Sequence, residues 1–214
     1  MDFLQKIMKP MLEGTAVSLE IFFLTLLFAI PLGMIVAFGR MSKNKFISKP
    51  VRAYQLIMRG TPLLLQLMIV FYAPYYIVGR TFDRFASAII AFVINYAAYF
   101  AEIFRAGIES IPQGQYEAAK VLGYSKSKTF FRIIVPQVVK RILPPMGNET
   151  MTLVKDTALA QTIAVMELFR VATNASSRAF STIPLLVAGL IYFILNYLVE
   201  KCYIKAEKKL DYYK

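Results

Sequence analysis

The amino-acid sequence predicts an all-α membrane protein, a polytopic helix bundle formed by one domain over residues 1–214. Apolar residues make up 57% of the chain, more than a soluble domain of this length buries. They gather in long uncharged runs, and the basic residues lie in short clusters between those runs. This layout is typical of membrane spans with cytoplasmic loops. It argues against nucleic-acid binding despite a formal net charge of +12, because no basic face is formed.

The chain offers little for metal binding or catalysis. It contains no His and a single Cys, Cys202, so we expect no zinc site, no haem site and no internal disulfide. The absence of His also removes the commonest general base. The first apolar run is too long for a signal peptide and lacks a small-residue cleavage site, so no cleavable leader is expected.

Four apolar runs are long enough to cross a bilayer as helices, which takes roughly 20 residues. Glu20 is the one charge in the first run, and Glu102 lies near the end of the third. The four runs cover residues 16–39, 55–78, 85–105 and 183–203.

A fifth segment, residues 146–169, is less apolar, because it carries four charged residues: Glu149, Lys155, Asp156 and Glu167. If it spans, the cytoplasmic side holds eighteen Lys and Arg against six on the outer side. If it does not span, the Lys-rich C-terminal tail falls outside, against the positive-inside tendency. We therefore expect five spans, an outer N-terminus and a cytoplasmic C-terminus.

The fifth segment is also the predicted wall of a pathway. A membrane segment this polar has to face protein or a watery cavity. The residues leave two interpretations open. Either the segment lines a pathway, or Lys155 and Asp156 pair with neighbours and fix the packing of the bundle.

The one long connection, residues 107–145, lies on the cytoplasmic side in this orientation. Residues 115–122 predict a short helix, and Gly123 stands where a left-handed C-terminal cap is wanted. Ser125 is the predicted N-cap of a following helix that we expect to end at Pro136. The residues alone are compatible with a docking platform or with a loop packed on the bundle.

This connection resembles the EAA loop of permease subunits in bacterial ATP-binding-cassette importers. The matching residues are Glu117-Ala118-Ala119, Gly123, Ile133 and Pro136. Other family motifs match RGTPLLLQL at 59–67, AYFAEIFRAGI at 98–108, and LPP at 143–145 followed by Asn148 and KDTAL at 155–159. Ala158 departs from the Ser that is often found there. Together the motifs cover nearly the whole chain and indicate the polar amino-acid branch, with the type I importer fold.

The resemblance implies a transport subunit that works by alternating access and is not itself an enzyme. Separate cytoplasmic ATPase subunits would bind ATP and Mg²⁺, so no cofactor is expected in this chain. Residues 123–129 do not form a phosphate-binding loop, because they lack its second Gly and follow no strand. The implied coupling residues are Tyr116, Glu117, Ala118, Ala119 and Gly123.

The resemblance also implies partners and a location. An extracytoplasmic substrate-binding protein would deliver an amino acid. A second permease subunit, expected to be another copy of this chain, would complete a bundle too small to enclose a path alone. The implied location is the bacterial cytoplasmic (inner) membrane, where lipid surrounds the chain.

Acidic groups within the spans favour a basic amino acid (arginine, lysine or histidine) as the substrate. A carboxylate can hold an α-ammonium group or a cationic side chain. Asn95, Tyr99 and Glu102 share one helix face, and Glu20 lies outside every family motif. The predicted substrate-binding residues are Glu102, Asp156, Tyr99, Asn95, Thr157 and Glu20.

Alternatives to this assignment stay open at the level of sequence. Glu20 also fits a solvated position near the outer interface, and the polar residues of the third span also fit interhelical hydrogen bonding. Importers of glutamine or glutamate-type amino acids share the motifs. From another class, an ATP-independent secondary transporter or channel is disfavoured by the EAA loop and the absence of an internal repeat.

Overall fold

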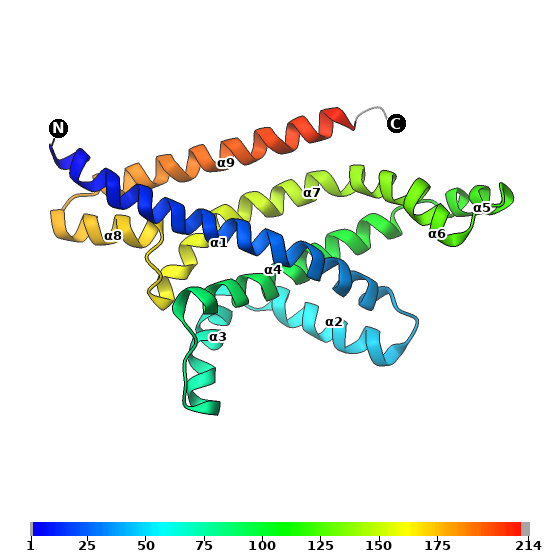
Figure 1. The fold of residues 1–214 in the computed structure, drawn as a ribbon, viewed down its shortest axis with the longest axis horizontal. Coiled ribbons are helices and arrows are strands. Elements are labelled where there is room, and N and C mark those ends of the chain that lie inside the picture. Colours follow the sequence, from blue (N-terminus) through cyan, green and yellow to red (C-terminus); the bar gives the residue numbers. More distant parts are fainter. Residues whose placement is uncertain (1, 211–214) are drawn as a thin grey trace.

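The fold is helical throughout the described part of the chain. The computed structural model describes residues 2–210, with side chains from residue 7 onward. Figure 1 shows α1, α4, α7 and α9 running along the longest axis, with α8 at one end and α5 and α6 at the other. The elements are α1 (Asp2–Met41), α2 (Lys45–Gly60), α3 (Leu63–Val78), α4 (Arg84–Glu109), α5 (Gln113–Val121), α6 (Lys126–Thr129), the π-helix η1 (Phe130–Ile134), α7 (Val135–Asp156), the 3₁₀-helix η2 (Thr157–Ile163), α8 (Leu168–Ala179) and α9 (Ile183–Lys209).

Three of these helices are long and apolar enough to cross a membrane: Ile7–Met41, Arg84–Glu109 and Ile183–Lys209. A fourth crossing is possible if α2 and α3 count as one broken span. The predicted all-helical membrane bundle is therefore confirmed. The fifth span, residues 146–169, is not among these helices, and its crossing stays a prediction.

The span predicted over residues 55–78 is not one continuous helix, because α2 and α3 meet at a 110° bend, and its crossing stays a prediction. Pro62 disfavours helical backbone at the residue before it, and Thr61 is extended, with φ −123° and ψ 149°. The break frees backbone carbonyls, and Gln66 satisfies two of them. Its side-chain amide donates to the carbonyl oxygens of Met58 at 3.0 Å and Thr61 at 3.1 Å. As a result α3 projects sideways from the bundle (Figure 1).

Residues 146–169 do not form one helix either. The α-helix ends at Asp156, a 3₁₀-helix continues to Ile163, and Ala164 is left-handed with φ 62°. The side chain of Glu167 then caps a separate helix, α8, by accepting from the backbone N–H of Arg170. The segment that charge placement predicts as a span is therefore broken by a 3₁₀ turn and a capped helix start.

The long connection over residues 107–145 is helical except at residues 110–112 and 122–125. The predicted helix end at Pro136 is wrong. The N–H of Val135 bonds the carbonyl of Phe130, five residues back, which closes a π-helical turn. Pro136, which has no N–H to donate, then falls in the first turn of α7, where the chain tolerates it.

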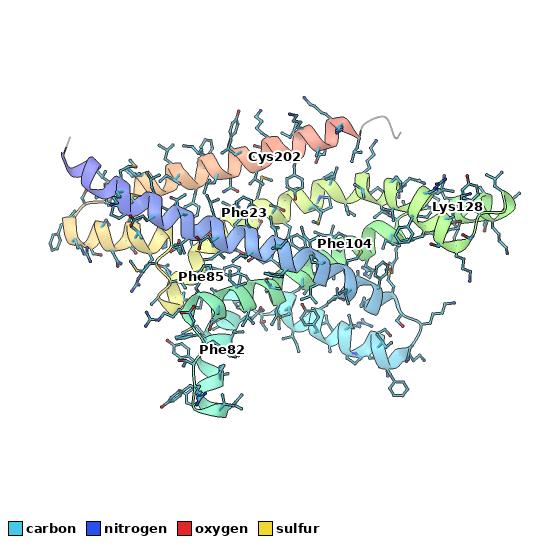
Figure 2. All side chains as sticks on the ribbon, viewed as in Figure 1. Phe23, Phe82, Phe85, Phe104, Lys128 and Cys202 are labelled. Atoms are coloured by element: carbon cyan, nitrogen blue, oxygen red, sulfur yellow. The ribbon has the colours of Figure 1, made fainter. Side chains whose placement is uncertain are left out.

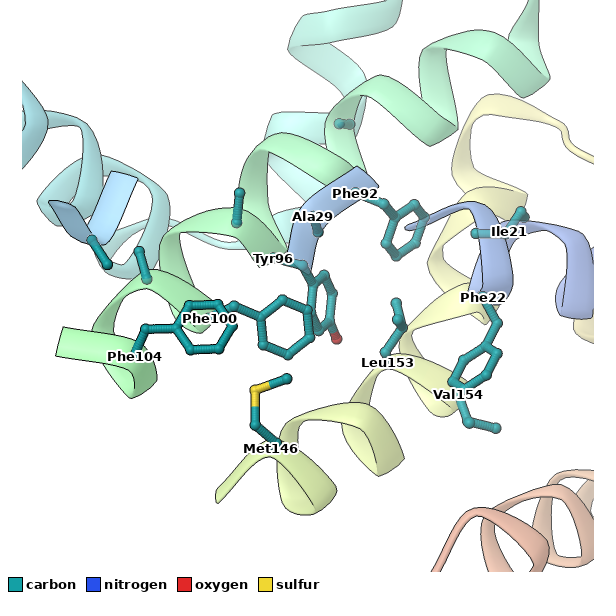
Figure 3. Packing of buried hydrophobic residues seen from close by; sticks show 14 of the residues in the cluster. Ile21, Phe22, Ala29, Phe92, Tyr96, Phe100, Phe104, Met146, Leu153 and Val154 are labelled. Atoms are coloured by element: carbon teal, nitrogen blue, oxygen red, sulfur yellow. The ribbon is translucent and has the colours of Figure 1, made fainter. Parts of the chain in front are cut away.

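The core lies where α1, α4 and α7 cross. Figure 3 shows Tyr96 and Phe100 of α4 packed between residues of α1 and α7. Small residues allow the close approach that membrane helices favour. A Cβ at Gly33 of α1 would stand 3.0 Å from the Cβ of Phe100, and one at Gly107 of α4 would stand 2.3 Å from Ile142.

Candidate functional site

Asn95, Tyr99 and Glu102 lie on one face of α4, as their spacing predicts, and this face contacts the end of α2. Asn95 donates from its amide to the carbonyl of Met58 at 3.0 Å and to the side-chain oxygen of Gln66 at 2.8 Å. One turn on, the guanidinium of Arg59 lies 5.5 Å from the ring centre of Tyr99. Asn95 therefore fixes the α2–α3 bend with its donors, and Tyr99 lies beneath a cation.

Glu102 belongs to an ion-pair network of α4 and α2. Arg105 donates from Nε to Glu102 at 3.0 Å and from a terminal nitrogen to its other oxygen, and it also pairs with Glu109. Arg59 lies 3.8 Å from Glu102. Beside this network is a cavity of about 450 Å³, and its lining includes Arg40 and Arg52. Three arginines (Arg40, Arg52 and Arg59) therefore line this cavity with a single carboxylate, that of Glu102.

Asp156 joins the same group from the opposite helix, α7. The hydroxyl of Tyr96 donates to Asp156 at 2.8 Å, and the rings of Tyr96 and Tyr99 are 6.3 Å apart. Thr157 follows Asp156 but is buried, and its hydroxyl donates to the carbonyl of Val154 at 2.8 Å. The structure therefore links Asp156 to Tyr99 through Tyr96, while Thr157 bonds its own helix.

Glu149 is a further carboxylate at this place that the sequence-based site omits. It lies seven residues before Asp156, hence on the same face of α7, and it is half-buried. It interacts electrostatically with Asp156 and with Arg59. Among residues 7–210 the structure gives it no hydrogen bond or ion pair. The seven-residue spacing of Glu149 and Asp156 within the predicted fifth span was the signal available in the sequence.

Glu20 does not join this group. It lies on an exposed stripe of α1 with Ala16, Phe23 and Leu27. Within one chain the structure therefore does not bring Glu20 to Asp156 or Glu102. Among the described side chains, no group of three or more His, Cys, Asp or Glu is placed to hold a metal ion.

The α5 region forms the tip of the molecule at the end opposite α8 (Figure 1). Gly123 has φ +75°, and two backbone bonds close the turn, from Gly123 to Lys120 at 3.0 Å and from Tyr124 to Ala119 at 3.0 Å. The predicted left-handed cap is confirmed, and so is Ser125 as the N-cap, which accepts from the N–H of Lys128. Backbone and side-chain hydrogen bonds therefore define the turn between α5 and α6.

Comparison with known proteins identifies the family. Residues 29–203 match the family model described as "Binding-protein-dependent transport system inner membrane component". The chain belongs to this family. It is a transport permease subunit and not an enzyme, and its family implies ATPase subunits and a binding protein as partners.

The similar proteins are permeases of amino-acid systems. The permease is 39% identical to the L-cystine transport system permease protein TcyB of Bacillus subtilis, over 99% of this chain and 92% of that protein. It is 37% identical to the putative glutamine transport system permease protein GlnP of Rickettsia conorii, over 92% and 91%. A crystal structure of an amino acid ABC transporter with histidines matches with a TM-score of 0.89 and 32% identity, covering 98% and 99%.

Within the permease, the EAA residues divide between two surfaces. Ala119 is 1% exposed and packs inward, whereas Glu117 and Ala118 face outward. Tyr116 is half-buried, and burial raises the pKa of its phenol, which keeps the hydroxyl protonated. Sequence reasoning missed the most exposed apolar residue of the tip, Val121, at 87% exposure.

Proposed function

We propose that this permease imports basic amino acids by alternating access, driven by separate ATPase subunits after delivery by an extracytoplasmic binding protein. The observation that carries the substrate class is the pair of carboxylates on one face of α7, Glu149 and Asp156. Glu149 has no hydrogen bond or ion pair among residues 7–210, and Asp156 accepts from the hydroxyl of Tyr96. Both therefore keep acceptor capacity for a ligand, in a segment that we propose crosses the membrane. Two anionic groups suit a substrate with two cationic groups.

The cation beside the carboxylates supports an amino acid in particular. Arg59 reaches Glu102 and Tyr99 from α2, and its charge also acts on Glu149. A guanidinium matches the planar α-carboxylate of an amino acid, and the acidic groups match its ammonium and side chain. The similar solved transporter with histidines is consistent with a basic substrate, whereas the cystine and glutamine relatives keep the neutral class as the second candidate.

We propose that two copies of the chain form the pathway, with the N-terminus of each on the outer side. The sideways projection of α3 supports this pairing, because its outer half is exposed and rich in aromatic side chains. Tyr75, Tyr76 and Ile77 are 58%, 83% and 80% exposed. Such a helix suits contact with a second bundle.

The substrate proposal is tested with the assembled permease and ATPase in lipid vesicles. Arginine and citrulline have nearly the same shape, but citrulline is neutral at the end of its side chain. We expect arginine to stimulate ATP hydrolysis, and citrulline and glutamine to need about tenfold higher concentration, about 1.4 kcal/mol of discrimination. Equal stimulation by glutamine would move the assignment to the neutral class. Uptake without ATP would instead indicate a secondary transporter.

The ATPase proposal rests on the exposed apolar tip of α5. Val121 and Leu122 are 87% and 72% exposed on a connection that lies outside the apolar spans, and such a patch indicates a protein interface. Val121→Asp is expected to weaken retention of the ATPase on the purified permease by about 30-fold, the effect of a hot spot worth about 2 kcal/mol. The matched control is Ser127→Asp, an exposed site on α6, which should retain the ATPase. Equal retention by both variants would remove the tip from the interface.

A further inference from the structure

A groove between α1 and α9 shares only Thr157 with the predicted substrate-binding residues. Its floor is α7 with the start of η2, and its volume is about 440 Å³. Phe23 on α1 and Leu198 on α9 stand at its rim, 61% and 54% exposed, so the groove opens to the outside of the bundle. Figure 2 labels Phe23 and Cys202, which lie on the two helices that form its walls.

The groove presents hydrocarbon, although hydroxyl groups stand in its wall. Thr150 and Tyr203 bond each other at 2.9 Å, and Thr157 donates to its own helix at 2.8 Å. The hydroxyl of Ser18 lies 3.5 Å from Glu167 and accepts from the N–H of Leu168 at 3.2 Å. Because these hydroxyls already have protein partners, a ligand in the groove needs no polar group to satisfy them.

The position of the groove along the spanning helices indicates what kind of molecule fills it. Its walls come from residues 18–26 of α1 and 195–203 of α9, both within helices long and apolar enough to span. At that depth the surroundings are lipid tails, and packing against them is the available way to cover apolar surface.

Charge marks one end of the groove. The stripe of α9 that lines it continues past Cys202 to Lys205 and Lys209, three and seven residues further on, and both are exposed. Residues 200–209 hold four lysines against two glutamates. A lysine cluster where a span leaves the membrane attracts anionic headgroups.

We infer that this groove binds an acyl chain of an anionic phospholipid whose phosphate headgroup lies at Lys205 and Lys209. The chain fills the hydrocarbon wall, and the two lysines select the headgroup. The site does not depend on which amino acid is transported. The lipid joins α1 to α9 across the floor of α7, next to the residues that bond Glu167.

The test is native mass spectrometry of the permease–ATPase complex after exchange into detergent with equal phosphatidylglycerol and phosphatidylcholine. We expect the complex to retain phosphatidylglycerol about tenfold over phosphatidylcholine. Val199→Phe places a ring in the groove and should remove the retained lipid. Ile194→Phe, at an exposed position of α9 outside the groove, is the matched control and should keep it.

The headgroup is tested separately. Lys205→Gln with Lys209→Gln should bring the two lipids to equal retention, while Lys208→Gln should leave the preference unchanged. Lipid retention unchanged by Val199→Phe would overturn the inference. So would a disulfide between the Cys202 residues of two copies, since a protein neighbour would then cover the groove.

Discussion

The carboxylates at the two ends of the polar segment over residues 146–169 differ in burial and in hydrogen bonding. Glu167 is 0% exposed and accepts from the N–H groups of Phe169 at 2.7 Å and Arg170 at 2.6 Å and from the hydroxyl of Tyr192 at 2.9 Å. Glu149 is half-buried and has no hydrogen bond within residues 7–210. A fully bonded carboxylate holds helices together, whereas a carboxylate without a hydrogen-bond donor is available to a ligand.

The largest effect should come from removing the bonded carboxylate. Glu167→Ala takes the N-cap from α8 and leaves the donors of Tyr192 and Arg170 without an acceptor. Each buried unsatisfied group costs about 1–3 kcal/mol, and loss of the cap costs about 1 kcal/mol. We therefore expect the free energy of unfolding to fall by about 3 kcal/mol or more. Thermal denaturation of the purified complex, followed by size exclusion, measures it.

Glu149→Ala is the matched control for this prediction, because it removes a carboxylate of the same segment that bonds no other side chain. It should change the denaturation midpoint little. A similar loss of stability in both variants would contradict the division of this segment into a bonded end and an available end.

The sequence predicted the class of this fold better than its breaks. Long apolar runs predict helices over residues 85–105 and 183–203, because length and apolarity are local properties, and α4 and α9 contain these ranges. The bend at Thr61 and the end of α7 at Asp156 depend on which side chains satisfy freed backbone groups. Those partners, such as Gln66, become visible only in three dimensions.

The candidate site was predictable in part for the same reason. Spacing alone places Asn95, Tyr99 and Glu102 on one face of α4, as found. Spacing does not reveal that the Asn95 amide donates its hydrogen bonds to residues at the α2–α3 bend. Nor does it reveal that Arg105 and Arg59 pair with Glu102. A residue type and a face can be derived from sequence, but the partners of each polar atom come from other helices.

The second-largest effect should come from neutralising Glu149, which should change substrate selectivity and leave the stability of the fold unchanged. Glu149→Gln keeps the size of the side chain and removes its charge at the available end. We expect the preference for arginine over citrulline in stimulated ATP hydrolysis to fall about tenfold, or about 1.4 kcal/mol.

Glu200→Gln, an exposed site on α9, should keep the arginine preference and serves as the control. An arginine preference that persists in Glu149→Gln would exclude Glu149 from the site. It would leave the substrate class intact, because the class is read from the unsubstituted permease.

The smallest effects should come from removing one tyrosine hydroxyl at each end of the segment over residues 146–169. Tyr192→Phe removes a donor from Glu167, and Tyr96→Phe removes the donor 2.8 Å from Asp156. A single hydrogen bond contributes about 1 kcal/mol, so Tyr192→Phe should lower stability by about that amount and leave the KM for arginine unchanged. Tyr96→Phe should raise the KM for arginine, because Asp156 then loses the hydroxyl that holds it in place. If Tyr192→Phe also shifted the KM, the bonded end would take part in transport, and the contrast between Glu167 and Glu149 would be one of burial alone.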